Sequence, residues 1–144
     1  MGIVRLCAAV NGKGDESMAA TTDNDGRFDT ALFHERYEMG GDGYLELAGT
    51  FVSYMDGEMQ VLTAAIERGG LTGSDALAKD MASRAHGLAG SGSTFGLRGV
   101  QEAALQLERT IRQGQQAMIR ACLVQLEEEC ALAREFLQRM TDES

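Results

Sequence analysis

The chain of 144 residues contains no proline and no tryptophan, and only 6% of its residues are aromatic. Proline interrupts helices more strongly than any other residue, so its absence leaves long helices uninterrupted. Strands are enriched in aromatic and β-branched residues. No useful length of this sequence alternates apolar and polar residues with the period of two that marks a half-buried strand. These absences predict an all-α protein with an aliphatic core and no sheet.

Long apolar runs, paired cysteines and an excess of positive charge are also missing. No apolar stretch approaches the ~20 residues that span a bilayer, which predicts a protein without membrane contact. The three cysteines, Cys7, Cys122 and Cys130, are an odd number, and the last two fall in one predicted helix. This usage favours reduced thiols in the cytoplasm over a disulfide framework. The formal net charge of −9 repels phosphodiester backbones and argues against nucleic-acid binding.

Apolar residues recur every three or four positions after residue 27. Residues 1–27 lack this periodicity and contain two polar stretches, 11–17 and 21–26, with glycine and asparagine, so they predict a flexible leader. Asp29 is expected to cap a short helix over residues 30–38. Longer amphipathic helices follow over residues 45–66, 74–91, 97–111 and 119–140. Short glycine-rich turns separate them. We therefore predict one domain over residues 28–144, an antiparallel up-down-up-down four-helix bundle with a short extra N-terminal helix.

His86 lies on the second of these long helices, whose apolar stripe is expected to comprise Leu77, Met81, Ala85 and Leu88. At about 100° per residue, His86 falls roughly 145° from the stripe, so we expect its imidazole to face solvent. Gly90 follows one turn later on the same side. A glycine inside a helix costs about 1 kcal/mol relative to alanine. This cost is understandable if another molecule must approach the imidazole closely.

The segment around His86 resembles the signature of histidine phosphotransfer (HPt) domains of two-component phosphorelays, roughly His-x-Leu-Lys-Gly, five variable residues and Gly. The matching residues are His86, Leu88, Gly90 and Gly96, with Phe95 before the last glycine. The surrounding helical pattern extends the resemblance over about Phe28 to Met140. One residue departs from the signature, because this chain has Ala89 where the family usually has lysine.

The resemblance implies that His86 accepts a phosphoryl group from the aspartyl phosphate of a receiver domain and passes it to another receiver. The implied partners are receiver domains of response regulators, including that of a hybrid histidine kinase. The receiver is expected to bring Mg²⁺, so this chain is expected to hold no metal or cofactor of its own. The sequence has no recognisable ATP-binding motif. We therefore predict a phosphohistidine carrier rather than an enzyme that phosphorylates itself.

Residues on the same side of the predicted helix as His86 are expected to form the docking surface for the receiver: Lys79, Ala82, Ser83, Ala89, Gly90 and Ser93. Their small size favours a flat patch. Lys79 lies two turns before His86, about 10 Å away by helix rise, and is the first candidate to replace the missing lysine. Arg84 and Arg98 are further candidates for that charge.

Two alternative functions remain open at this point. Ala89 also fits an interaction module of the same fold that has lost transfer. The chain also fits the phosphoacceptor domain of a chemotaxis-type kinase, in which a separate kinase domain would phosphorylate His86. We interpret the remaining features structurally: Glu127–Glu129 as a solvated helix face, Cys122 and Cys130 as buried small hydrophobes, and His34 as a solvated residue. The run from Gly90 to Gly96 does not follow a strand, so it is not interpreted as a phosphate-binding loop.

Overall fold

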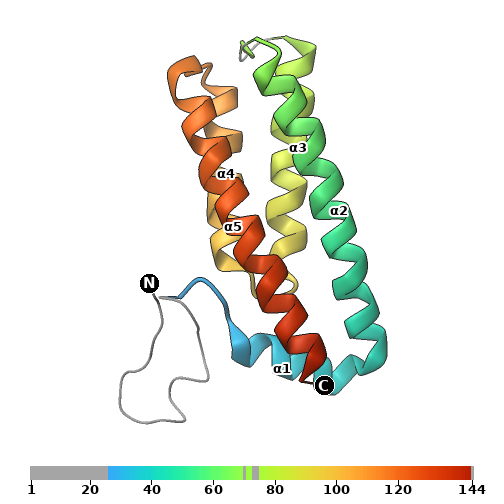
Figure 1. Cartoon of the computed structure of the whole chain (residues 1–144). Coiled ribbons are helices and arrows are strands. Elements are labelled where there is room, and N and C mark those ends of the chain that lie inside the picture. Colours follow the sequence, from blue (N-terminus) through green and yellow to red (C-terminus); the bar gives the residue numbers. More distant parts are fainter. Residues whose placement is uncertain (1–25, 70, 73–74, 144) are drawn as a thin grey trace.

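A computed structural model describes residues 26–69, 71–72 and 75–143. These residues form five helices, and each of the four long ones runs antiparallel to the next (Figure 1). The helices are α1 (Thr30–Gly40), α2 (Asp42–Glu67), α3 (Ala76–Ser93), α4 (Arg98–Arg112) and α5 (Gln116–Asp142). The short α1 lies across one end of the bundle. The predicted all-α up-down-up-down bundle with an extra N-terminal helix is confirmed. The described residues contain no strand, only an isolated bridge between Phe28 and Leu97.

Carboxylate caps define where α1 and α3 begin. Asp29 accepts a hydrogen bond from the Leu32 amide at 3.0 Å, as expected from the sequence. The start of α3 differs from the prediction, which placed it at residue 74. The helix instead begins at Ala76, because the Asp75 side chain accepts from the Ala78 amide at 2.6 Å and is itself the cap. These hydrogen bonds lower the pKa of Asp75. The bond from the Ala78 amide has the largest effect, and the bond from the Thr72 side chain has the second largest.

The turn between α3 and α4 lies nearer to α4 than the glycine-rich run suggests. Residues 92–96 were expected to interrupt the helix, but α3 continues through Ser93, and Gly92 is buried beside Val100. The chain reverses at Gly96, which has a φ of +73°. A β-carbon there would lie 2.7 Å from the Asp29 carbonyl oxygen. Both the positive φ and this close approach require glycine.

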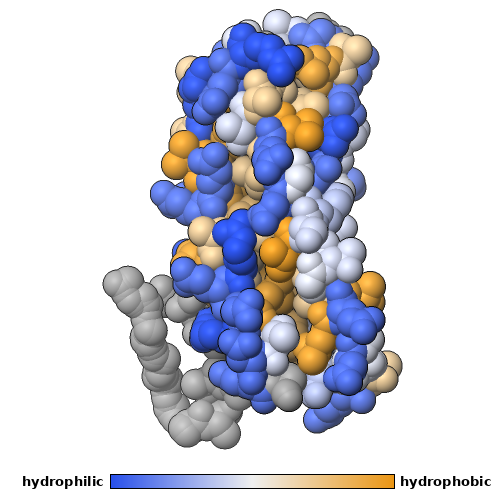
Figure 2. Space-filling view, turned by 45° about the vertical axis from the view of Figure 1, so that its right-hand side comes forward, coloured by the Kyte–Doolittle hydropathy of each residue, from blue (hydrophilic) through white to orange (hydrophobic). Residues whose placement is uncertain are grey.

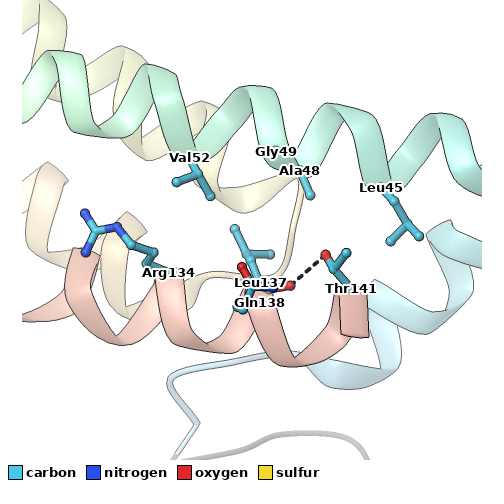
Figure 3. A pocket seen from close by; sticks show the side chains of 8 residues that line it. All are labelled: Leu45, Ala48, Gly49, Val52, Arg134, Leu137, Gln138 and Thr141. Atoms are coloured by element: carbon cyan, nitrogen blue, oxygen red, sulfur yellow. Dashed lines mark hydrogen bonds between the residues drawn. The ribbon is translucent and has the colours of Figure 1, made fainter. Parts of the chain in front are cut away.

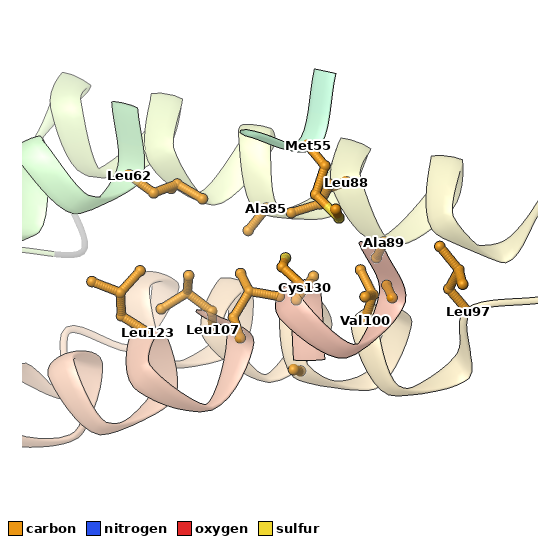
Figure 4. Close-up of a cluster of buried hydrophobic side chains, with 14 of the residues drawn as sticks. Met55, Leu62, Ala85, Leu88, Ala89, Leu97, Val100, Leu107, Leu123 and Cys130 are labelled. Atoms are coloured by element: carbon orange, nitrogen blue, oxygen red, sulfur yellow. The ribbon is translucent and has the colours of Figure 1, made fainter. Parts of the chain in front are cut away.

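Alanine and leucine side chains let α3 pack closely against α4, the most extensive contact between any two helices (Figure 4). The predicted apolar stripes of α4 and α5 are buried throughout: Leu97, Val100, Ala104, Leu107, Ile111, Ile119, Cys122, Leu126, Ala133, Leu137 and Met140. The stripe of α3 is confirmed at Met81, Ala85 and Leu88. It is wrong at Leu77, which is 45% exposed near the start of the helix, where no neighbour covers it fully.

The chain is already part of the packed bundle before α1 begins. Phe28 stacks on Phe136 with ring centroids 4.3 Å apart. The Arg27 guanidinium donates to the Glu129 carboxylate at 2.7 Å. Glu129 is buried, so the expectation that residues 127–129 form a solvated face is wrong at this residue. A carboxylate is tolerated in the interior when it is paired with a cation, as Glu129 is with Arg27. The predicted leader lies outside the described residues except for Gly26 and Arg27.

The outside of the bundle is mixed in character. On the face shown in Figure 2, hydrophobic residues occur in separate patches between hydrophilic ones. A groove of about 250 Å³ separates α2 from α5, where Ala48 and Gly49 face Leu137 and Thr141 (Figure 3). No helix in the described ranges combines the length and the apolar character that crossing a membrane requires.

Candidate functional site

His86 lies in the middle of α3, and 68% of its side chain is exposed. Its neighbours Ala85 and Leu88 are fully buried, so the core holds the helix by the other face. The outward orientation predicted from the apolar stripe is therefore the one observed. The imidazole is accessible to a partner while its backbone is fixed by the α3–α4 contact.

The His86 ring has one hydrogen-bond partner among the described residues, the side chain of Glu108 on α4. The Nδ1 atom lies 2.9 Å from Oε1 of Glu108. Only 16% of the Glu108 side chain is exposed, so this carboxylate is held in place between the two helices. Glu108 was not among the site residues predicted from the sequence.

Arg112 completes the group from one turn further along α4. Its Nε donates to the second carboxylate oxygen of Glu108 at 2.9 Å. Partial burial alone would raise the pKa of Glu108, but the hydrogen bonds and charges of His86 and Arg112 outweigh it and leave the pKa below its usual value. Glu108 is therefore ionised at neutral pH and can only accept hydrogen bonds.

An acceptor at Nδ1 determines the tautomer of His86. Since the Glu108 carboxylate has no proton to donate, the hydrogen of the neutral imidazole must be on Nδ1. The lone pair is then on Nε2, on the other side of the ring. This is the tautomer that a nucleophilic Nε2 needs, and the contact with Glu108 selects it.

Two glycines flank the imidazole, and they differ in what surrounds them. A β-carbon at Gly87 would lie 3.2 Å from the Tyr54 hydroxyl, so α2 approaches the helix closely there. A β-carbon at Gly90 would meet nothing within 4 Å. Packing within the described part of the chain therefore gives no reason for glycine at position 90. Its cost to the helix, about 1 kcal/mol, is therefore not offset by a closer approach of any described residue.

The set of docking residues predicted on α3 requires correction. Ala82 and Ala89 are 0% and 2% exposed, because both face the neighbouring helices, so they cannot contact a partner. Lys79, Ser83 and Gly90 are exposed as expected. Ser93 is partly exposed, and its hydroxyl donates to the Gly90 carbonyl at 2.7 Å. The accessible surface on α3 is thus narrower than the predicted one.

The arginines proposed as substitutes for the missing lysine are paired with other carboxylates. Arg84 contacts Glu58 at 3.0 Å and Asp80 at 3.3 Å. Arg98 contacts Asp29 at 3.1 Å, near the turn between α3 and α4. Neither arginine belongs to the group formed by His86 and Glu108.

Exposed apolar residues lie beside the site on α2 rather than on α3. Leu47 is 57% exposed and Tyr54 is 36% exposed. Together with Ser91 and Phe95, they line an open depression between α2 and α3. Because Tyr54 also approaches Gly87, one edge of this depression lies beside the residue that follows His86.

A signal for Glu108 exists in the sequence, but it depends on the register of two helices. If α3 and α4 form an antiparallel pair that turns near Gly96, residues equally far from the turn lie opposite one another. His86 then faces the region of residues 102–109, in which Glu102 and Glu108 are the acidic residues. Helix periodicity alone could not choose between them.

The comparisons with known proteins agree with this geometry. Residues 46–136 match the family model of the Hpt domain. The chain belongs to the Hpt domain family. Histidine phosphotransfer is therefore the class of activity to which this bundle belongs, and proteins of the family are phosphocarriers rather than kinases.

The fold of this Hpt bundle is similar to that of a solved structure. A crystal structure of histidine-containing phosphotransfer protein B (HptB) from Pseudomonas aeruginosa PAO1 gives a TM-score of 0.71 at 24% sequence identity. The similarity covers 82% of this chain and 96% of that chain. At this identity the likeness concerns the fold. A comparison with curated proteins found no match.

Proposed function

We propose that His86 accepts a phosphoryl group from the aspartyl phosphate of a receiver domain and transfers it to a second receiver. The observation that carries this proposal is the exposed imidazole whose Nδ1 is held by an ionised carboxylate, in a chain of the Hpt family. Receiver domains of response regulators, including one attached to a hybrid histidine kinase, are the proposed partners.

The chemistry requires little of this chain beyond positioning. Nε2 of neutral His86 attacks phosphorus, the Nε2–P bond forms, and the bond from phosphorus to the aspartyl oxygen breaks, which releases the receiver's carboxylate. The imidazole becomes cationic because its Nδ1 proton stays in place. Glu108 stabilises that positive charge through the hydrogen bond it already makes. A ring that keeps this proton remains a good leaving group, so the transfer can run in both directions.

The remaining requirements of the transition state would come from the partner. Phosphoryl transfer depends mainly on in-line positioning and on neutralising the charge of the phosphoryl oxygens. We propose that the receiver supplies Mg²⁺ for the second purpose. The sequence has no recognisable ATP-binding motif, so this chain would receive phosphate from other proteins and not from ATP.

We place the docking site on the side of the bundle formed by α2 and α3. The exposed apolar residues Leu47 and Tyr54 border the depression between α2 and α3, and Tyr54 reaches Gly87, next to His86. Because Gly90 has no side chain, the backbone of α3 is accessible one turn after the imidazole. A receiver that covers both would bury apolar area and bring its aspartyl phosphate to Nε2.

The experiment is transfer from phosphorylated receivers of the same cell, with detection of acid-labile phosphate on this chain. We expect labelling of the wild-type protein and of His34→Gln, which changes the exposed histidine on α1, and none of His86→Gln. Labelling only by a kinase domain supplied with ATP would instead make the chain a chemotaxis-type phosphoacceptor. Specific binding of a receiver without any labelling would make it an interaction module.

A further inference from the structure

The departure from the family signature at position 89 raises the question of which residue balances the charge of a phosphorylated His86. We propose that Arg112 does so, by neutralising Glu108 and by presenting its remaining N–H groups to the phosphoryl group. The proposal rests on the proposed function, because it concerns the phosphorylated state of His86. It assigns a role in transfer to a residue on a different helix from the histidine.

Position 89 itself is unsuited to this role. Ala89 is only 2% exposed and lies on the buried side of α3. The other cations considered for the role are either paired or distant. Arg84 and Arg98 contact carboxylates that are not part of the site. Lys79 is about 10 Å away along the helix axis. Among the described cations, Arg112 is the one hydrogen-bonded into the group that contains His86.

Phosphorylation creates an electrostatic problem that Arg112 is positioned to solve. The phosphoryl group on Nε2 carries up to two negative charges and the carboxylate at Nδ1 carries a third, whereas the cationic ring between them offsets only one. Like charges at such a distance oppose one another, more strongly where protein excludes water. A guanidinium bound to Glu108 offsets the carboxylate charge, so Glu108 can orient the imidazole without discouraging phosphorylation.

The geometry of the arginine leaves it free to act on the phosphoryl group as well. Only Nε is used in the contact with Glu108, and the two terminal nitrogens have no hydrogen-bond partner among the described residues. The side chain is 48% exposed, on the same side of α4 as the carboxylate that holds His86. A planar guanidinium can bind a carboxylate and a phosphoryl oxygen at once, which a lysine ammonium does less well. Arg112 neither gains nor loses a proton in this role.

The test measures the ionisation of the phosphoryl group rather than activity alone. The full chain is phosphorylated with phosphoramidate, and the second pKa of the phosphohistidine phosphoryl group is followed by ³¹P NMR. We expect Arg112→Gln to raise this pKa by about 0.3 to 0.7 units, the effect of one partly exposed ion pair. Arg112→Lys should recover part of the difference. The matched control is Arg109→Gln on the same helix, whose terminal nitrogen contacts Gln106 instead, and it should cause no shift.

The outcomes separate this inference from the function on which it rests. An unchanged phosphoryl pKa in both Arg112 variants, with His86 still phosphorylated, would overturn the role of Arg112 and leave the carrier function intact. An equal shift in Arg109→Gln would also overturn it, because the effect would then be one of general charge. Failure of His86 to accept phosphate from phosphoramidate and from every receiver would refute both. Circular dichroism of each variant verifies that the bundle is folded.

Discussion

Replacement of Gly90 by alanine should stabilise the bundle and at the same time impair transfer. The position is exposed inside α3, and an added β-carbon would meet nothing within 4 Å. Alanine should therefore give nearly its full propensity advantage, about 0.5 to 1 kcal/mol in the free energy of unfolding. For a domain of this size, that corresponds to a rise of about 2 to 5 °C in the melting temperature.

The effect on transfer should have the opposite sign. A methyl group one turn from His86 stands on the surface that we assign to the receiver, and a displacement of about 1 Å in the docked complex can cost a factor of up to 10² in rate. We expect receiver-dependent transfer to fall about tenfold or more. Phosphorylation by phosphoramidate should be unchanged, because a small donor reaches the imidazole without resting on position 90.

The matched control is Gly49→Ala on α2, which is also helical and exposed, has no atom within 4 Å of its β-carbon, and faces the groove toward α5. It should stabilise by a similar amount and leave transfer unchanged. Thermal unfolding by circular dichroism and transfer rates from a phosphorylated receiver measure the two effects. Equal transfer rates in Gly90→Ala and the wild type would show that glycine at position 90 serves no partner.

Three further predictions concern stability and reactivity. Ala89→Lys, which would restore the family signature, should destabilise the bundle by about 1 to 3 kcal/mol in urea unfolding, because the position is buried; unchanged stability would contradict the observed packing. Arg27→Ala should cost about 1 to 3 kcal/mol by leaving the Glu129 carboxylate unpaired, whereas Arg98→Ala, which loses an exposed pair, should cost less than about 1 kcal/mol. Burial raises the pKa of the Cys130 thiol to about 12, so iodoacetamide at pH 8 should label it only after unfolding, as followed by peptide mass spectrometry.

The helices and their buried faces could be predicted because both depend on local patterns. Spacings of three and four along residues 97–111 and 119–140 determine which side of each helix meets the core, and glycine pairs mark where helices end. The outward orientation of His86 followed from the same periodicity. The predictions were wrong where contacts with neighbouring helices determine burial. Leu77, near the start of α3, is exposed, whereas Ala82 and Ala89, which face the adjacent helices, are buried.

The rest of the site depends on contacts between helices, which periodicity does not specify. His86 and Glu108 are separated by 22 positions and meet only because α3 and α4 are antiparallel with a particular register. Glu129 and Arg27 are 102 positions apart, and their pairing requires the segment before α1 to pack against α5. A run of three glutamates looked uniformly solvated because no local signal marks which one faces a distant arginine.

The proposed transfer depends on Glu108, which holds the Nδ1 hydrogen of His86 and leaves Nε2 to carry the phosphoryl group. The direct measurement is to phosphorylate the full chain, locate the modified residue by mass spectrometry, and distinguish the two phosphohistidine isomers after alkaline hydrolysis. We predict the Nε2 isomer on His86 alone, with the Nδ1 isomer increasing in Glu108→Ala. Phosphate on Nδ1 of His86 in the wild-type protein, or on another residue, would contradict the account.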